Sequence, residues 1–156
     1  MKQTTSLDDI DRRILRALQV DALLSHADLA DRVGSSTASC WRRVRALEAA
    51  GILGPAVRLL DAAKVNCGVN IICNVRMRSH AREKTAAFEE FIAGRSEVMD
   101  CYSMSGEWDY LLRIVAADVA GYEHFLMRVL LDHPSVATAS SHFALSQTKY
   151  STRLPV

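Results

Sequence analysis

Apolar residues recur at helical spacing through the first third of the chain. Residues 7–20 repeat them with a period near 3.6, and acidic residues come early, where the helix dipole favours them. Ser25 and Ser36 are good N-caps for two further helices, which Gly34 and Gly51 are expected to end. Three short helices, with a turn of three or four residues between the last two, predict a helix-turn-helix.

The pattern changes after the third predicted helix. Residues 52–60 have the apolar spacing of a short strand, although Gly54 and Pro55 interrupt it. Residues 61–67 are expected to form a hinge. We therefore place a helix-turn-helix domain, with its connecting strand, at residues 7–60.

From Gly68 the apolar residues alternate with polar ones, as is typical of a strand. The segments that follow predict the order βαββαβ, with strands over 69–77, 97–104, 108–116 and 136–145 and helices over 80–93 and 118–132. This order is the ferredoxin-like arrangement. We therefore expect an α+β fold, in which residues 68–150 form the second domain.

Both faces of the predicted sheet carry apolar residues. In the first strand, Ile72 points to the face opposite Ile71 and Cys73. In the strand over 108–116, Leu111 and Val115 likewise point away from the face of Tyr110, Leu112 and Ile114. Two helices can cover only one face of a four-stranded sheet, so a second apolar face requires another sheet against it. We expect the chain to form a homodimer through this domain.

The third predicted helix has a cationic outer side. On a helical wheel, Cys40, Val44 and Leu47 form its buried side. The start of the helix and the side away from the core hold small and basic residues, namely Ser36, Thr37, Ala38, Ser39, Arg42, Arg43 and Arg45. Arginine can hold a phosphate or a guanine edge through two hydrogen bonds, and small residues allow close approach to the groove. We interpret this surface as a reader of double-stranded DNA.

A solvated basic face, paired within the protein, is the alternative interpretation of the same helix. Arg43 is the residue most open to that alternative, because Glu48 or Asp11 could bind it. Trp41 is expected to be a core or helix-packing residue rather than a wedge in DNA.

Composition narrows the classes of protein to which the chain could belong. The formal net charge of +1 gives no support of its own to nucleic-acid binding, which therefore rests on the local charge. No apolar run approaches the roughly 20 residues that span a bilayer, and the N-terminus lacks the apolar stretch of a secretory signal, so we expect a cytoplasmic protein with no membrane partner. The four cysteines form no CxxC pair, which predicts buried free thiols, no metal and no cofactor.

The motifs together identify a family resemblance. The segments LDDIDRRILRALQVDALLSHADLADRVGSS, CWRRVRALEAAGIL, SGEWDYLLRI and HPSV resemble the leucine-responsive/asparagine-regulator (Lrp/AsnC) family of transcription factors, from about Leu7 to Leu154. The resemblance implies a winged helix-turn-helix followed by a RAM-type ferredoxin-like domain. It also implies that members pair through the second domain, often assemble further into octamers, and bind amino acids or related metabolites between dimers.

The resemblance places an effector site around the turn that is matched here by residues 105–109. A glycine there permits a tight turn with N–H groups free for a carboxylate, and a carboxylate can take an ammonium. The positions that match the family's pocket are Tyr102, Met104, Gly106, Asp109 and Ser141. The residues alone leave an alternative for each position. Gly106 could belong to an ordinary hairpin turn, and Asp109 could be a turn cap or half of a surface ion pair. Tyr102 and Met104 could pack in the sheet or at an interface, and Ser141 could be a solvated strand residue.

These observations together predict a sequence-specific DNA-binding transcriptional regulator, associated with the nucleoid, that a small-molecule effector, an amino acid, controls. Two other classes stay open: a chromosome-organising protein that wraps DNA with little ligand control, and an enzyme on a ferredoxin-like scaffold. The enzyme has the weaker case, because the sequence offers no nucleophile–base pair, phosphate loop or metal cluster.

Overall fold

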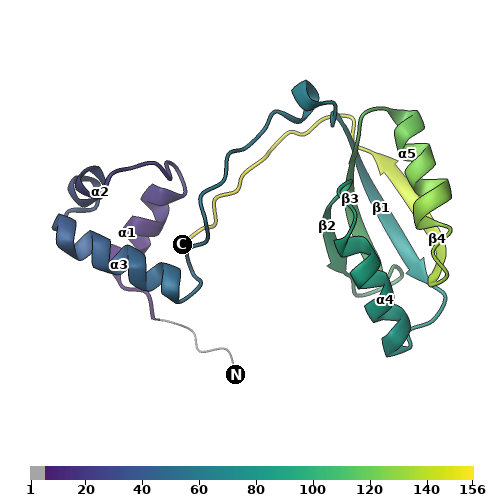
Figure 1. Cartoon of the computed structure of the whole chain (residues 1–156), viewed down its shortest axis with the longest axis horizontal. Coiled ribbons are helices and arrows are strands. Elements are labelled where there is room, and N and C mark those ends of the chain that lie inside the picture. The colour runs from purple at the N-terminus through teal and green to yellow at the C-terminus, as the bar shows by residue number, and fades with distance from the viewer. Residues whose placement is uncertain (1–5) are drawn as a thin grey trace. The chain divides into compact units, whose positions relative to one another are not determined.

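The computed structural model describes residues 6–156, and their contacts divide them into two units (Figure 1). One unit extends to Arg58 and also takes in Lys149–Val156 from the other end of the chain. The other unit is Leu59–Thr148. Each has its own hydrophobic core, so each is described by itself.

The described part of the first unit contains three α-helices, which are α1 (Asp9–Leu18), α2 (His26–Val33) and α3 (Thr37–Ala49). Ser25 and Ser36 cap the second and third helices as predicted, since each accepts a hydrogen bond from the N–H three residues on. Gly34 ends α2 with φ at 68°, a backbone region where a Cβ is unfavourable. The predicted helix-turn-helix is confirmed.

The three helices share one core. Cys40, Val44 and Leu47 are buried on one side of α3, as the helical wheel predicted. They pack with buried residues of α1 and α2, namely Ile14, Leu15, Ala17, Leu29, Ala30 and Val33. Burial of this stripe turns the opposite side of α3 to solvent.

The C-terminal segment packs on α1 within the same unit. Gln19 donates a hydrogen bond from Nε2 to the Leu154 carbonyl (3.3 Å) and accepts one at Oε1 from the Leu154 N–H (2.6 Å). Arg16 Nε donates to the Val156 carbonyl at 2.6 Å, and the Val156 side chain packs against the helical core. The contacting residues lie beyond residue 150, where the second predicted domain ended, and belong to the unit that holds the helix-turn-helix.

The prediction of a strand over residues 52–60 was wrong, because these residues form no regular secondary structure. A strand needs a neighbour that takes its N–H and C=O groups, and Pro55 has no N–H to offer. Val57, Leu59 and Leu60 in this segment are exposed. A 3₁₀ turn, η1 (Ala62–Val65), follows within the expected hinge.

The second unit has the predicted order of elements: β1 (Val69–Met77), α4 (Arg82–Ala93), β2 (Val98–Ser103), β3 (Tyr110–Ala116), α5 (Val119–Phe125), the π-helical extension η2 (Leu126–Leu130) and β4 (Val136–Phe143). All strand pairs in residues 59–148 are antiparallel, and the strand order is β2-β3-β1-β4. The α+β fold with a βαββαβ second domain is confirmed.

One face of this sheet is packed against α4 and α5. Its side chains bury with both helices in one core, which is formed by Ile71, Cys73, Val75, Met77, Phe88, Ile92, Tyr110, Leu112, Ile114, Tyr122, Phe125, Leu130 and Val136. The residues between them on the strands, among them Ile72, Leu111 and Val115, are only partly buried. The sheet therefore has the second, partly apolar face that the sequence predicted, and we call it the open face.

The cysteines were predicted less well. All four are free thiols, but only Cys40 and Cys73 are buried, whereas Cys67 is partly exposed and Cys101 is exposed on the edge strand β2. No group of three or more His, Cys, Asp or Glu side chains in residues 6–156 could hold a metal ion. Among the same residues, every helix is too short or too polar to cross a bilayer.

A buried polar contact beneath α5 gives a test of this core. The Tyr122 hydroxyl lies 2.5 Å from Ser141 Oγ, and Tyr122 is 2% exposed. Tyr122→Phe would leave the serine hydroxyl without that partner, so we expect the melting temperature to fall by roughly 4–8 °C, equivalent to about 1 kcal/mol. Tyr150→Phe, at a tyrosine that is 61% exposed, is the matched control in thermal denaturation followed by circular dichroism. Equal melting temperatures for both variants would contradict this role.

Candidate nucleic-acid interface and effector turn

The exposed side of α3 carries most of the residues predicted to contact DNA. Ser36, Thr37 and Ala38 are exposed at the start of the helix, and Ser39 is partly buried. Ser36 Oγ caps the helix by accepting a hydrogen bond from the Ser39 N–H, which leaves the Ser36 O–H as a donor. The small side chains leave the backbone of this first turn accessible from solvent.

Two of the predicted arginines are available to a ligand. Arg42 is exposed, and no ion pair joins it to another residue in the part of the chain that the structure describes. The Arg45 side chain is 67% exposed, and its Nη1 lies 3.3 Å from Glu48 Oε2. An exposed pair of this kind contributes little to stability, so a phosphate could replace the glutamate readily.

Arg43 is held by the protein instead. Its Nη1 lies 2.7 Å from Asp8 Oδ2 and 2.8 Å from Asp11 Oδ1, with the side chain 26% exposed. The hydrogen bond to Asp11, and next that to Asp8, raises the pKa of Arg43 above its ordinary value. Arg43 therefore ties α3 to the start of α1. This favours the alternative in which Arg43 is paired within the protein over the prediction that it contacts DNA.

Trp41 was predicted to be a packing residue, and that prediction was wrong. Its side chain is 52% exposed, because it lies on a flank of α3 beside the exposed side rather than on the stripe that begins at Cys40. The guanidinium carbon of Arg45 lies 5.9 Å from the centre of its ring, within the range of a cation–π contact. Trp41 and Arg45 thus form one exposed pair.

The predicted effector turn joins β2 to β3 in a hairpin. The Met104 N–H donates to the Asp109 carbonyl at 2.8 Å, which closes the turn. Gly106 has φ at 112°, a conformation that L-residues with a side chain rarely adopt. Glycine at this position is therefore required by the backbone of the turn itself.

Asp109 already has two partners in the chain. Its Oδ2 accepts a hydrogen bond from the Met77 N–H, and its Oδ1 lies near His80 Nε2, both at 2.7 Å. The Met77 N–H first, and then His80, hold the pKa of Asp109 below its ordinary value of 3.8. Asp109 thus ties the end of β1 to β3, a role close to the cap or ion pair that was its alternative.

Further residues around the turn were missed by sequence reasoning. Arg76 Nη2 lies 2.7 Å from Glu107 Oε1, and the Arg76 guanidinium carbon lies 5.1 Å from the ring centre of Trp108. Together with His80, they surround Asp109 with charged and aromatic groups. Glu107 and Trp108 lay within the quoted motif, but the pattern of one chain does not reveal that Arg76 and His80 reach the same turn.

The predicted effector residues do not all lie on one face. Tyr102 is exposed and pairs in the sheet with Leu111, a residue of the open face. Met104, two residues later, is also exposed. Ser141 pairs with the buried Cys73 and bonds to Tyr122 of α5, which places it on the helix-covered face. One chain therefore does not bring Ser141 to Tyr102 and Met104.

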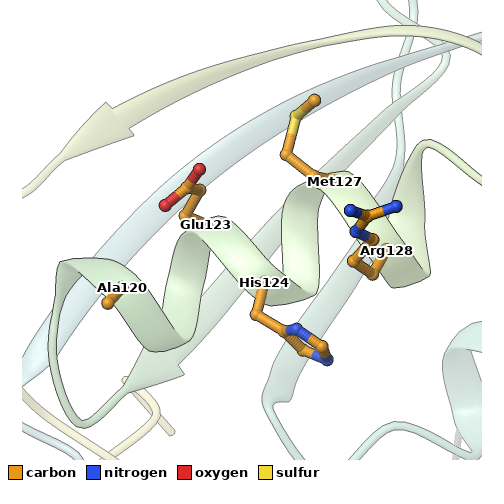
Figure 2. Close-up of a pocket in the computed structure, with 5 residues that line it drawn as sticks. All are labelled: Ala120, Glu123, His124, Met127 and Arg128. Atoms are coloured by element: carbon orange, nitrogen blue, oxygen red, sulfur yellow. The ribbon is translucent and has the colours of Figure 1, made fainter.

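Two shallow depressions lie elsewhere in the second unit. One, of about 340 Å³, is lined by Glu89, Ile92, Ala93, Cys101, Ser103 and Tyr110. The other, of about 190 Å³, lies on α5 and its extension (Figure 2). In Figure 2, Glu123 and Met127 point to one side of the helix and His124 to the other, so these groups do not converge on a common centre. Neither depression includes a predicted effector residue.

Family models match both units of the chain. A model described as the AsnC-type helix-turn-helix domain matches residues 7–48, and one described as the Lrp/AsnC ligand binding domain matches residues 70–154. The first range covers α1, α2 and α3 except Ala49, and the second covers the four-stranded sheet except Val69.

Individual relatives match over nearly the whole length. The DNA-binding transcriptional activator DecR of Escherichia coli strain K12 is 37% identical over 150 residues, which cover 96% of this chain and 99% of that protein. A transcriptional regulator from Neisseria meningitidis, solved as an L-Met complex, is 35% identical with a TM-score of 0.92, and the match covers 96% and 97% of the two chains. An AsnC family regulator from Agrobacterium tumefaciens is 44% identical with a TM-score of 0.91 and the same coverage.

Comparing Arg43→Ala with Arg42→Ala tests whether Arg43 stabilises the fold while the exposed Arg42 does not. We expect Arg43→Ala to lower the melting temperature of the first unit by several degrees near neutral pH, because Asp8 and Asp11 lose their partner, while Arg42→Ala leaves it unchanged. The lowered pKa of Asp8, caused first by the Asp11 N–H and then by Arg43, gives this effect a pH dependence.

A lowered carboxyl pKa stabilises the fold above the ordinary value of 3.8, and that stabilisation is lost as the pH falls through the lowered value. The difference between Arg43→Ala and the parent chain should therefore shrink as the pH falls below about 4 in thermal melts. A difference that stays constant down to pH 2 would show that Arg43 acts through something other than these carboxylates.

Proposed function

The chain belongs to the Lrp/AsnC family of transcriptional regulators, and on that premise we propose that it is a sequence-specific DNA-binding regulator controlled by an amino acid. The family and the relatives described above are regulators rather than enzymes. The single observation that carries the DNA-binding proposal is the exposed cationic side of α3, whose opposite side is fixed in the helical core.

Arg42 and Arg45, with the small residues 36–39, form the proposed contact with double-stranded DNA. In a helix-turn-helix the second helix of the motif lies in the major groove with its first residues at the base edges. Here that helix is α3, and Arg42 is the residue best placed to hold a phosphate or a guanine, since it is exposed and unpaired among residues 6–156. Binding DNA is the basis for proposing a cytoplasmic, nucleoid-associated protein.

The open face of the sheet is the proposed dimer interface. Its partly buried residues Ile72, Leu111 and Val115 are apolar, and an apolar sheet face is stabilised when a second sheet covers it. A dimer would present two copies of α3 to successive major grooves about 34 Å apart. Further assembly of dimers into an octamer is proposed from family membership.

The effector is proposed to be an amino acid, bound where the turn at residues 105–109 of one dimer meets another dimer. The Neisseria relative was solved with L-Met, which is the precedent for this ligand class. The turn offers backbone N–H groups for a carboxylate, and Asp109 offers a carboxylate for an ammonium. Because Ser141 lies on the helix-covered face, Tyr102, Met104, Gly106 and Asp109 are the residues that could share one pocket in a single chain.

His80 is expected to compete with the effector for the Asp109 carboxylate. Its Nε2 lies 2.7 Å from Asp109 Oδ1, the position that an effector's ammonium group would take. An amino acid would therefore have to share or displace that contact. His80 is exposed, so its ring can move away without disturbing the core.

The DNA proposal is tested by duplexes selected from a random pool and titrated by fluorescence anisotropy. We expect Arg42→Ala to weaken binding at least 10-fold, the effect of losing about 1.4 kcal/mol, while the dimer measured by light scattering stays intact. Arg82→Ala, at an exposed arginine of α4, should bind like the parent chain. Unchanged affinity for Arg42→Ala would contradict the proposal, and equal affinity for selected and random duplexes would favour a chromosome-organising protein instead.

The effector proposal is tested by calorimetry with L-methionine and a panel of the other amino acids. We expect one or more of them to bind the parent chain, Asp109→Asn to abolish that binding, and His80→Ala to increase the affinity several-fold because the competing group is gone. Asp109→Asn should still bind the selected duplex. The proposed site would be wrong if Asp109→Asn bound the effector as tightly as the parent chain, or if no amino acid bound.

A further inference from the structure

Trp41 is the most exposed large apolar side chain of α3. It is 52% exposed, although tryptophan carries the largest apolar surface of any residue and is normally mostly buried in a monomeric protein. It lies next to Ala38 and Arg45 on the helix surface, because residues three and four positions apart are neighbours there. Trp41 therefore borders the surface that is proposed to face DNA.

Trp41 also lies within cation–π range of Arg45. The guanidinium carbon of Arg45 lies 5.9 Å from the Trp41 ring centre, and Glu48 Oε2 lies 3.3 Å from Arg45 Nη1. A long arginine side chain loses rotamer freedom when it binds, so one that is already held against a ring has less freedom to lose. The three residues follow one another along one flank of α3, because they are spaced four and three positions apart.

We propose that Trp41 is a base-contacting residue that determines sequence preference by packing against the 5-methyl group of thymine in the major groove. The proposal rests on the proposed DNA-binding function. Thymine presents the apolar methyl group on the major-groove edge of a base pair, and an apolar side chain is what discriminates it. Trp41 is the large apolar side chain on the flank that borders the exposed side of α3, and it lies beside Arg45, which could bind a neighbouring guanine or phosphate.

Two other roles for an exposed tryptophan fit the structure less well. A packing role within the first unit does not agree with its exposure, since the core of α1, α2 and α3 is complete without it. A wedge between base steps is characteristic of proteins that bind the minor groove, whereas a helix-turn-helix places its second helix in the major groove.

The test replaces each thymine of a selected duplex in turn by uracil, which lacks only the methyl group. We expect the full-length parent protein to lose about 3- to 10-fold in affinity at one or two positions, the effect of exposing roughly one methyl group. Trp41→Ala should bind the unmodified duplex more weakly and show no loss at those positions. Trp41→Phe, which keeps an apolar ring, should retain part of the loss, and Arg45→Ala should keep the uracil effect while binding all the duplexes more weakly.

Several results would overturn the inference. Trp41→Ala binding with the parent's affinity, or losing affinity at the same uracil positions as the parent, would show that the indole contacts no thymine methyl. An equal loss by Trp41→Ala on selected and random duplexes would indicate a backbone contact instead. If the parent selects no preferred duplex, the proposed function fails and this inference with it, whereas a preferred duplex without a uracil effect overturns the Trp41 contact alone.

Discussion

Burial of one apolar stripe of α3 determines which side of this helix can contact a ligand. Cys40, Val44 and Leu47 pack against α1 and α2, and a helix that buries one side must expose the other. The Arg43 contacts with Asp8 and Asp11 add a polar tie on the flank of the same stripe. The direction of Arg42 and Arg45 thus follows from the packing of residues that never touch a ligand.

In the second unit, too, burial of one set of side chains determines which others are exposed. Alternation along β1 and β3 sends one set of side chains beneath α4 and α5 and leaves the other set on the open face. The turn proposed to bind the effector lies at one end of this sheet, where Asp109 fastens the end of β1 to β3 through the Met77 N–H. The contact that fastens β1 to β3 and the proposed ligand site therefore use the same carboxylate.

Much of this could be predicted from the sequence, because the signals are local. Ser25, Ser36 and Gly34 mark helix ends by their own chemistry, and the period of apolar residues shows which side of a helix or strand is buried. The misses depend on neighbours distant in sequence or on the absence of one. Trp41 is exposed because no element covers its flank within the described residues, and the segment 52–60 is not a strand because no neighbour pairs with it there. Likewise, the partnership of His80 with Asp109 joins two segments that no local pattern connects.

We propose that DNA binds the exposed side of α3, which the buried stripe of the same helix orients. The most direct measurement is hydroxyl-radical labelling of side chains, read by mass spectrometry with and without a bound duplex. We expect strong protection of residues 36–45, including the readily oxidised Trp41, with little change on α4 in the second unit. Equal labelling of α3 in the free and DNA-bound protein, with protection confined to Leu59–Thr148, would contradict it.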